Sequence, residues 1–276
     1  MAIRNLPPSF AEEAVAAIDA RLTEIERDHG VSISLAIESG SRAWGFPSPD
    51  SDYDCRFVFV RPVDHYLSPW QQRDVIETPL EGDLDVNGWD LAKAIKLLLK
   101  GNAVIIEWLT SPIVYAADAQ FREEFLALAT RHASRELIGR HYLHLGDRQR
   151  RVYFGEGKRV AQKKIFYALR PAAALRWLRL HPGEAVAPMH FPTLMAECDP
   201  PNEVVAITED LTARKAVTRE LGDTALPEPI ARFIDEEFES ARAVFETGPA
   251  VITADAKRDA DDFFRAAVMR FDRTRS

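Results

Sequence analysis

The chain has 276 residues, of which 46% are hydrophobic and 28% are charged, and its formal net charge is −8. This composition is typical of a globular protein with one large core or two compact domains, and it excludes a disordered or collagen-like chain. No apolar run is long enough to span a membrane, and the N-terminus lacks the features of a signal peptide, so we expect a cytoplasmic protein. Cys55 and Cys198 lack metal-ligand spacing and are expected to be free thiols.

The first predicted elements are a helix over residues 9–29 and a short apolar strand over residues 31–37. Gly40 and Ser41 follow the strand, where a tight turn into a short helix would expose backbone N–H groups that can bind a phosphate. Arg42, directly after this turn, is a further candidate phosphate contact. The turn therefore predicts a nucleotide-phosphate site.

Two aspartates one residue apart, Asp52 and Asp54, follow a proline-rich loop and lead into a β-rich run over residues 55–60. Because side chains alternate along a strand, residues two apart point to the same face. Two carboxylates on one face suit Mg²⁺ or Mn²⁺, which takes a few hard oxygen ligands together with substrate phosphates. The segment therefore predicts a metal-dependent phosphoryl-transfer site.

Other interpretations apply to the same aspartates. A calcium loop starting at Asp50 would need Gly at its sixth position and Glu at its twelfth, where the sequence has Cys55 and Arg61. A phosphatase of the haloacid dehalogenase type would need the aspartates at the end of an apolar strand, whereas here they precede one. A solvated turn would explain an isolated Asp-x-Asp pair, but the upstream Gly-Ser turn favours the metal site.

Residues 74–90 hold further acidic residues and predict a hairpin with its turn at residues 81–82. On the returning strand, period-2 alternation puts Asp83, Asp85 and Asn87 on one face. Asp85 is the preferred candidate ligand on this strand. Asp83 lies next to the turn and stays open as an alternative.

Asp90 is the third candidate, but it directly precedes a helical pattern over residues 91–100. A carboxylate at this position accepts hydrogen bonds from exposed N–H groups of the first helical turn. A helix cap is therefore the preferred role of Asp90, ahead of metal binding.

The Gly-Ser turn and the Asp-x-Asp pair together resemble the signature of the DNA polymerase beta-like nucleotidyltransferase superfamily, which normally supplies a third carboxylate from a later strand. Residues 87–115 and 163–178 resemble one branch of it, the predicted nucleotidyltransferases associated with bacterial RNA-repair operons. The likeness spans most of residues 31–178. It implies transfer of a nucleoside monophosphate from an NTP, with metal ligands Asp52, Asp54 and Asp85.

A helix predicted over residues 158–181 places Lys163, Tyr167 and Arg170 on a different face from its buried stripe, which consists of Phe166, Leu169, Ala173 and Trp177. A lysine and an arginine seven residues apart can both reach a triphosphate, and the tyrosine can stack or form a hydrogen bond. This face predicts a nucleotide clamp. The alternative is a surface helix with solvated basic residues. Pro171 is expected to kink the helix.

Residues 131–179 form a basic stretch, with thirteen Lys or Arg against three acidic residues. Interleaved with tyrosine and phenylalanine, such a stretch can follow a polynucleotide backbone and stack bases, which makes RNA a candidate partner. Equally, its charges can belong to amphipathic helices whose charged faces meet the acidic remainder of the chain.

The order of elements predicts an α+β fold: a small mixed β-sheet nucleotidyltransferase domain over residues 1–117 and a helical C-terminal domain over residues 118–276, with the active cleft between them. A chain break is expected at residues 247–249. The helices predicted for the second domain cover residues 121–132, 136–145, 158–181, 203–221, 229–247 and 254–271.

The leading functional hypothesis is Mg²⁺-dependent transfer of a nucleoside monophosphate from an NTP to an acceptor hydroxyl, with an RNA end as the expected acceptor. Transfer to a hydroxyl of a protein or a small molecule stays open. A second hypothesis, from another functional class, is a nucleotide-binding or partner-binding protein on the same scaffold that performs no turnover. The choice of NTP and the oligomeric state are not predicted.

Overall fold

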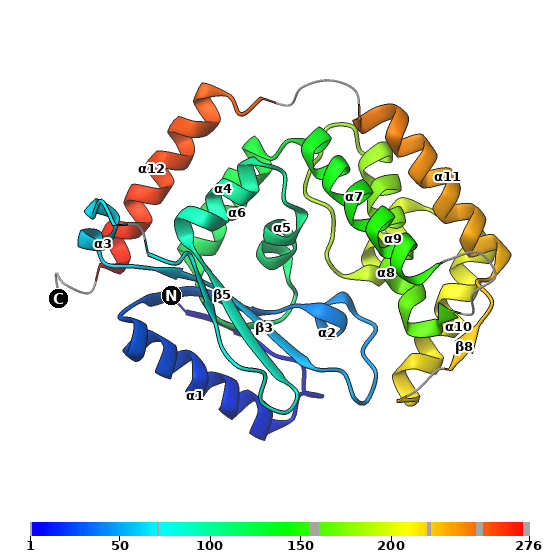
Figure 1. Cartoon of the computed structure of the whole chain (residues 1–276), viewed down its shortest axis with the longest axis horizontal. Helices are drawn as coiled ribbons and strands as arrows, with labels where there is room; N and C mark the ends of the chain where they lie inside the picture. The colour runs from blue at the N-terminus through cyan, green and yellow to red at the C-terminus, as the bar shows by residue number, and fades with distance from the viewer. Residues whose placement is uncertain (1, 71, 155–159, 220–221, 247–250, 273–276) are drawn as a thin grey trace.

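The computed structural model describes residues 2–70, 72–154, 160–219, 222–246 and 251–272. Within these residues, six strands form one mixed sheet in the order β1-β6-β2-β3-β5-β4 (Figure 1). The neighbouring strands β3 and β5 are parallel, and all other neighbours are antiparallel. The strands are β1 (Ala2–Asn5), β2 (Ser32–Glu38), β3 (Tyr53–Val60), β4 (Val75–Glu77), β5 (Leu84–Asp90) and β6 (Val114–Asp118).

Helices cover both faces of this sheet. One face packs on α1 (Glu12–His29), and α4 (Leu91–Leu99), α5 (Ala103–Thr110) and α6 (Ala119–His132) lie on the other side (Figure 1). On β3, Phe57 contributes to the core under α1 and Val58 to the core on the opposite face. A strand covered on both faces needs apolar side chains in both directions, which explains the continuous apolar run at the end of β3.

The remaining long helices form a group beside the sheet, in which α8 is central (Figure 1). α8 packs against α7, α9 and α11, and most of its residues are buried on all sides. The group consists of α7 (Arg135–Tyr153), α8 (Gln162–Leu180), α9 (Phe191–Cys198), α10 (Asn202–Val217) and α11 (Glu228–Phe245). The short elements are α2 (Gly40–Trp44), α3 (Val63–Leu67) and the ribbon of β7 (Val160–Ala161) with β8 (Asp223–Thr224).

The last helix, α12 (Ala254–Phe271), returns to the sheet and packs on α4, α6 and β3. The Ser32 hydroxyl donates a hydrogen bond to the Phe271 carbonyl at 3.1 Å, which joins the end of α12 to β2. A single apolar cluster contains residues of the sheet, of the helical group and of α12. The proposed domain division at residue 117 therefore crosses a shared core, and it stays a prediction.

The predicted α+β class is confirmed, and the helix predicted over residues 254–271 coincides with α12. α7 is longer than predicted, reaching Tyr153, and α8 begins at Gln162 and continues through Pro171. The predicted helix limits at residues 158, 221 and 247 and the break at 247–249 lie outside the described residues. Sequence analysis missed β1, because a four-residue strand has no periodicity and its partner β6 lies more than 100 residues away.

Two further predictions concern the cysteines and membrane-spanning segments. Cys55 and Cys198 are free thiols, as expected, and both are buried. Among the described residues, the structure contains no helix with the length and apolar character needed to cross a membrane.

A buried ion pair joins the helical group to the rest of the molecule. Glu107 of α5 and Arg170 of α8 are 4% and 6% exposed, and Arg170 Nη1 donates to Glu107 Oε1 at 2.9 Å. The Tyr142 hydroxyl of α7 donates to the same oxygen at 3.2 Å, and the Arg170 guanidinium lies 4.2 Å from the ring centroid of Trp44 on α2. One charge pair thus connects four helices. Arg170 was predicted on an exposed face, and this prediction is wrong.

We expect Glu107→Gln to lower the free energy of unfolding by about 3 kcal/mol or more, because the Arg170 cation would stay buried without its counter-charge. Denaturant unfolding measures the change. The matched control is Asp255→Asn, which breaks the ion pair with Arg258 that lies exposed on α12 and is expected to change stability very little. Equal changes in the free energy of unfolding would contradict the expectation that the buried pair stabilises the protein more than the exposed pair.

Candidate active site

The sheet register brings Asp54 and Asp85 side by side. β3 and β5 are parallel, and Asp54 is paired with Asp85 across the two strands. The predicted hairpin is present as β4 and β5, with an isolated bridge between Glu81 and Leu84. Asp83 lies outside β5, where its backbone carbonyl accepts from the Tyr53 N–H at 2.7 Å. By position, Asp85 is therefore the better of these two candidates for a third ligand.

Asp90 lies at the opposite end of β5 and caps α4, as predicted. Its Oδ1 accepts from the Ala92 N–H at 2.8 Å, and its Oδ2 accepts from the Tyr66 hydroxyl at 3.0 Å. This location separates Asp90 from Asp54 by most of the length of the strand pair.

The Gly-Ser turn packs directly against Asp54. Gly40 has a φ of +58°, and a Cβ at this position would lie 1.9 Å from Asp54 Oδ2. The Ser39 N–H also donates to the Asp54 carbonyl at 2.8 Å. Only glycine allows both the left-handed backbone and this close approach, so the residue at position 40 determines how near the turn comes to the carboxylate.

Arg42 holds the loop that carries Asp52. Its Nη2 donates to the Ser51 carbonyl at 2.6 Å, its Nε donates to the Asp52 carbonyl at 3.1 Å, and its guanidinium lies 3.9 Å from the Tyr53 ring centroid. The Ser41 hydroxyl lies 3.1 Å from the Ser51 hydroxyl in the same loop. Arg42 was predicted as a phosphate contact. In the structure, its guanidinium is instead engaged with the loop backbone and the Tyr53 ring.

Arg56 lies between the two neighbouring carboxylates. Its Nη2 is 3.0 Å from Asp54 Oδ1 and 2.6 Å from Asp85 Oδ2, and Asn87 donates to the other oxygen of Asp85. Burial raises the pKa of Asp54, and the charges of Asp85 and Asp52 raise it further, whereas Arg56 lowers it. The positive charge of Arg56 therefore offsets part of the negative charge that Asp54 and Asp85 bring together.

The carboxylate oxygens near Asp54 determine whether a divalent cation can bind at this end of the strand pair. Among the described residues, no group of three or more acidic, histidine or cysteine side chains is close enough to hold a metal ion. Asp85 is held by Arg56 and Asn87, but the Asp52 carboxylate has no hydrogen-bond or ion-pair partner within the described part of the chain. Asp52 and Asp54 supply hard oxygens, which fit Mg²⁺ when substrate phosphates complete its coordination. The fit thus rests on two carboxylates, with Asp85 adjacent.

Glu38 is a buried carboxyl group that sequence analysis missed. Its Oε1 accepts from the Asp54 N–H at 3.0 Å and its Oε2 accepts from the Tyr115 hydroxyl at 2.5 Å. Burial raises the pKa of Glu38 to about 7, against the opposing effect of these two hydrogen bonds. The sequence did contain a signal for Glu38, an acidic residue at the end of an apolar strand. A carboxyl group buried at such a position needs hydrogen-bond partners.

The first two turns of α8 carry Lys163 and Tyr167, which were predicted as part of a nucleotide clamp. The pKa of Asp50 is lowered by a hydrogen bond with Ser48 and further by the charge of Lys163, which is exposed. The pKa of Tyr167 is raised mainly by burial, and further by the nearby Tyr153 and by the charges of Asp54 and Asp52. Lys163 and Tyr167 therefore lie within electrostatic range of the carboxylate loop, whereas Arg170, one turn further on, is paired with Glu107.

Two more lysines belong to this region and were missed. Lys215 of α10 donates to the Phe46 carbonyl at 2.5 Å, and burial lowers its pKa to about 8. Lys164 Nζ lies 4.7 Å from the ring centroids of both Tyr153 and Tyr167. Lys215 comes from a segment far along the chain, so no local pattern could have associated it with this site.

The basic stretch over residues 131–179 is largely engaged in internal contacts. Five of its arginines form ion pairs with acidic side chains of other elements, while its residues 155–159 lie outside the described part of the chain. The pairs are Arg131 with Asp259, Arg150 with Asp235, Arg170 with Glu107, and Arg176 and Arg179 with Glu237. This pairing agrees with the amphipathic-helix interpretation.

Comparisons with known proteins give one family and one relative. A profile described as "RNA repair pathway DNA polymerase beta family" (RlaP) matches residues 15–266. "Uncharacterized protein YcgL" of Bacillus subtilis (strain 168) is 42% identical over 218 residues, which cover 79% of this chain and 83% of that protein. The resemblance to the RNA-repair branch of the superfamily is therefore confirmed.

Glu38 predicts a pH dependence of stability. Because folding raises its pKa from 4.5 to about 7, the folded state retains a proton that the unfolded chain has released between these values. Relative to Glu38→Gln, the wild-type free energy of unfolding should fall by roughly 3 kcal/mol as the pH rises from 5 to 8. Denaturant unfolding of both proteins at the two pH values tests this. An equal change in the free energy of unfolding of wild type and Glu38→Gln between the two pH values would contradict this prediction.

The close approach of Gly40 to Asp54 predicts a difference between two Gly→Ala substitutions. Gly30 has the same left-handed backbone, with a φ of +59°, but nothing lies within 4 Å of its Cβ position. Gly30→Ala should therefore lower the free energy of unfolding by about 1 kcal/mol, the usual left-handed penalty. Gly40→Ala should cost at least about 2 kcal/mol more, because it also displaces Asp54. Equal losses in thermal or denaturant unfolding would contradict the contact.

Proposed function

Because the chain belongs to the RNA repair pathway DNA polymerase beta family, we propose that it is a metal-dependent nucleotidyltransferase. It moves a nucleoside monophosphate from an NTP to an acceptor hydroxyl. One observation carries the proposal beyond the family: the Gly40 turn packs against the Asp54 carboxylate, and Asp54 is paired in register with Asp85. A phosphate-binding turn and adjacent carboxylates are the two components that this chemistry requires.

Each side chain has a separate task in this proposal. Asp52 and Asp54 hold Mg²⁺ or Mn²⁺, which neutralises the phosphates and activates the attacking hydroxyl when it is bound. Glu38 fixes the backbone at Asp54 through the Asp54 N–H. Gly40 and Ser41 offer backbone N–H groups to the β- and γ-phosphates. Catalysis then depends on positioning and on charge neutralisation.

The triphosphate needs positive charge that no carboxylate of the described residues already neutralises. Lys163 is exposed at the start of α8, and Lys164 lies beside Tyr153 and Tyr167. The sequence predicted a clamp of Lys163 and Arg170. Because Arg170 is buried in its pair with Glu107, Lys164 takes its place beside Lys163 in this proposal. Tyr167 supplies a ring and a hydroxyl for the nucleotide.

The acceptor in this proposal is an RNA end. Its support is the family description and two exposed arginines of α7, Arg148 and Arg151, which have no carboxylate partner among the described residues. Such cations bind phosphate backbones without sequence preference. Hydroxyls of proteins and of small molecules are the competing acceptors.

A second candidate function, nucleotide binding without turnover, is favoured by the position of Arg56. This guanidinium already occupies the space between Asp54 and Asp85, where a second cation would compete with it. A protein of this kind would bind an NTP and release no pyrophosphate.

The deciding experiment is incorporation of each labelled NTP, with Mg²⁺ or Mn²⁺, onto a panel of RNA ends, proteins and small-molecule hydroxyls. We expect transfer to an RNA end that falls by at least about a hundredfold in Asp52→Asn or Asp54→Asn, because each loses a charged metal ligand. The control is Asp83→Asn, a turn carboxylate outside the strand pair, which should keep activity within about threefold.

The panel also separates the alternatives. Product on a protein or small molecule alone would reject the RNA acceptor while keeping the transferase. NTP binding without pyrophosphate release would favour the non-catalytic protein. Equal activity in wild type, Asp52→Asn and Asp54→Asn would reject the proposed metal ligands.

A further inference from the structure

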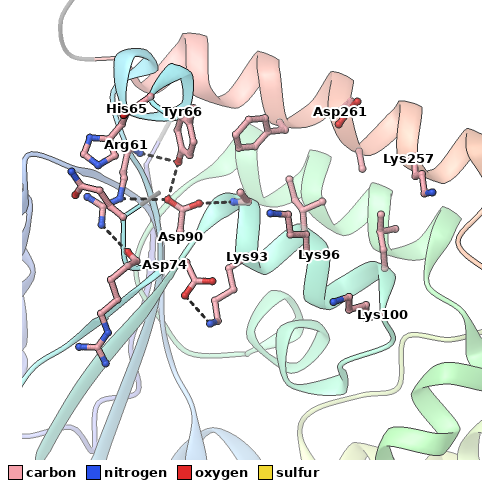
Figure 2. Close-up of a pocket in the computed structure, with 18 of the residues that line it drawn as sticks. Arg61, His65, Tyr66, Asp74, Asp90, Lys93, Lys96, Lys100, Lys257 and Asp261 are labelled. Atoms are coloured by element: carbon pink, nitrogen blue, oxygen red, sulfur yellow. Dashed lines mark hydrogen bonds and ion pairs between the residues drawn. The ribbon is translucent and has the colours of Figure 1, made fainter. Parts of the chain in front are cut away.

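A pocket of about 710 Å³ lies at the end of the sheet opposite to Asp54, between α3, α4 and α12 (Figure 2). Arg61, which directly follows β3, and Asp90, at the end of β5, both line it. Six strand residues separate Asp54 from the end of β3, a distance of about 20 Å. A ligand in this pocket is therefore separate from one held at the Asp52 and Asp54 loop.

The pocket is basic in a chain whose net charge is −8. Its lining includes six Lys or Arg and three Asp residues. Some of these charges are compensated, since Lys93 Nζ is 3.0 Å from Asp74 Oδ1 and Arg61 Nε is 3.7 Å from Asp90 Oδ2. Arg73 pairs with Glu77, outside the lining.

Three lysines are left without an acidic partner among the described residues: Lys96, Lys100 and Lys257. Lys96 is on α4, Lys100 directly follows this helix as its C-cap residue, and Lys257 is on α12 across the pocket (Figure 2). The Nε2 atom of His65 is also buried and has no hydrogen-bond partner in the described structure. The third aspartate of the lining, Asp261, is on α12 with Lys257 and pairs with Arg265 at 3.5 Å. The three lysines match a group with two or three negative charges better than a single carboxylate.

Part of the lining is apolar. It consists of Ile95 and Leu99 of α4 and of Ile252, Ala260 and Phe264 of the C-terminal segment, which together are called the apolar wall. Pockets of roughly 300–1,000 Å³ with apolar walls and a few polar groups typically bind small molecules. The basic helices α7 and α8 lie in the helical group on the other side of the molecule (Figure 1).

We infer that this pocket binds a small molecule that carries a diphosphate or polyphosphate on an apolar body, such as a nucleoside diphosphate. Lys96, Lys100 and Lys257 bind the phosphates, and the apolar wall contacts the body of the ligand. This second site is independent of the proposed nucleotidyl transfer. The two sites occupy opposite ends of the parallel strands β3 and β5.

The test measures binding of ADP and of inorganic pyrophosphate to the full chain by isothermal titration calorimetry, in EDTA so that no divalent cation contributes. Lys96→Ala, Lys100→Ala and Lys257→Ala are combined in one variant. All three side chains are exposed, so the fold should tolerate their loss. We expect ADP affinity to fall by about tenfold or more. Pyrophosphate should bind more weakly than ADP, since it lacks a body for the apolar wall.

Two control variants show whether a loss of ADP binding is specific to the pocket lysines. Arg27→Ala, Arg214→Ala and Arg258→Ala together remove the same charge from exposed positions outside the pocket and should leave ADP binding unchanged. Asp52→Ala with Asp54→Ala, at the other end of the sheet, should also leave it unchanged.

Four outcomes would overturn the inference. These are the absence of saturable ADP binding, an equal loss in the lysine and arginine variants, a loss in the aspartate variant, and equal affinities for ADP and pyrophosphate. A single-stranded oligoribonucleotide is titrated in parallel. If it binds in a lysine-dependent manner where ADP does not bind, the pocket belongs to an RNA path and the small-molecule site is rejected.

Discussion

The buried pair of Glu107 and Arg170 is the interaction on which the arrangement of the molecule depends. A buried charge is tolerated only beside its partner, so α5 and α8 have one favourable relative position. Trp44 is held in the same arrangement, because the Arg170 guanidinium lies over its ring.

 Trp44 is the last residue of α2, the short helix that begins with Gly40 and Ser41. The same pair therefore orients both the turn at Gly40 and Ser41, which is proposed to bind phosphate, and the helix that carries Lys163 and Tyr167.

A second constraint is the concentration of carboxyl groups around Asp54. Asp85 is its neighbour across the strands, Glu38 binds its N–H, and Asp52 lies two residues before it. Burial and the charges of Asp85 and Asp52 disfavour ionisation of Asp54, and Arg56 offsets them in part. An arrangement of this kind favours the arrival of further positive charge, which is the electrostatic condition for a metal-assisted reaction on phosphates.

The parallel pair of β3 and β5 separates two surfaces of opposite character. Carboxylates gather where these strands begin, and lysines and arginines gather where they end. Because both strands run in the same direction, residues before the two strands meet at one end of the sheet and residues after them meet at the other. The polarity of the strand pair thus keeps an acidic site and a basic pocket about 20 Å apart in one small protein.

The sequence by itself determined the features that depend on neighbouring residues: the Asp52 and Asp54 pair, the Asp90 cap, the α12 helix and the α+β class. Periodicity and spacing carry this information because short-range backbone geometry is the same in every fold. The partners of charged side chains were decided only by the tertiary structure. Arg170 and Arg42 proved to be engaged inside the protein, while Glu38, Lys215 and the pocket under α12 gained their surroundings from distant segments. Such contacts join residues that no local pattern relates, so they emerge only when the chain is folded.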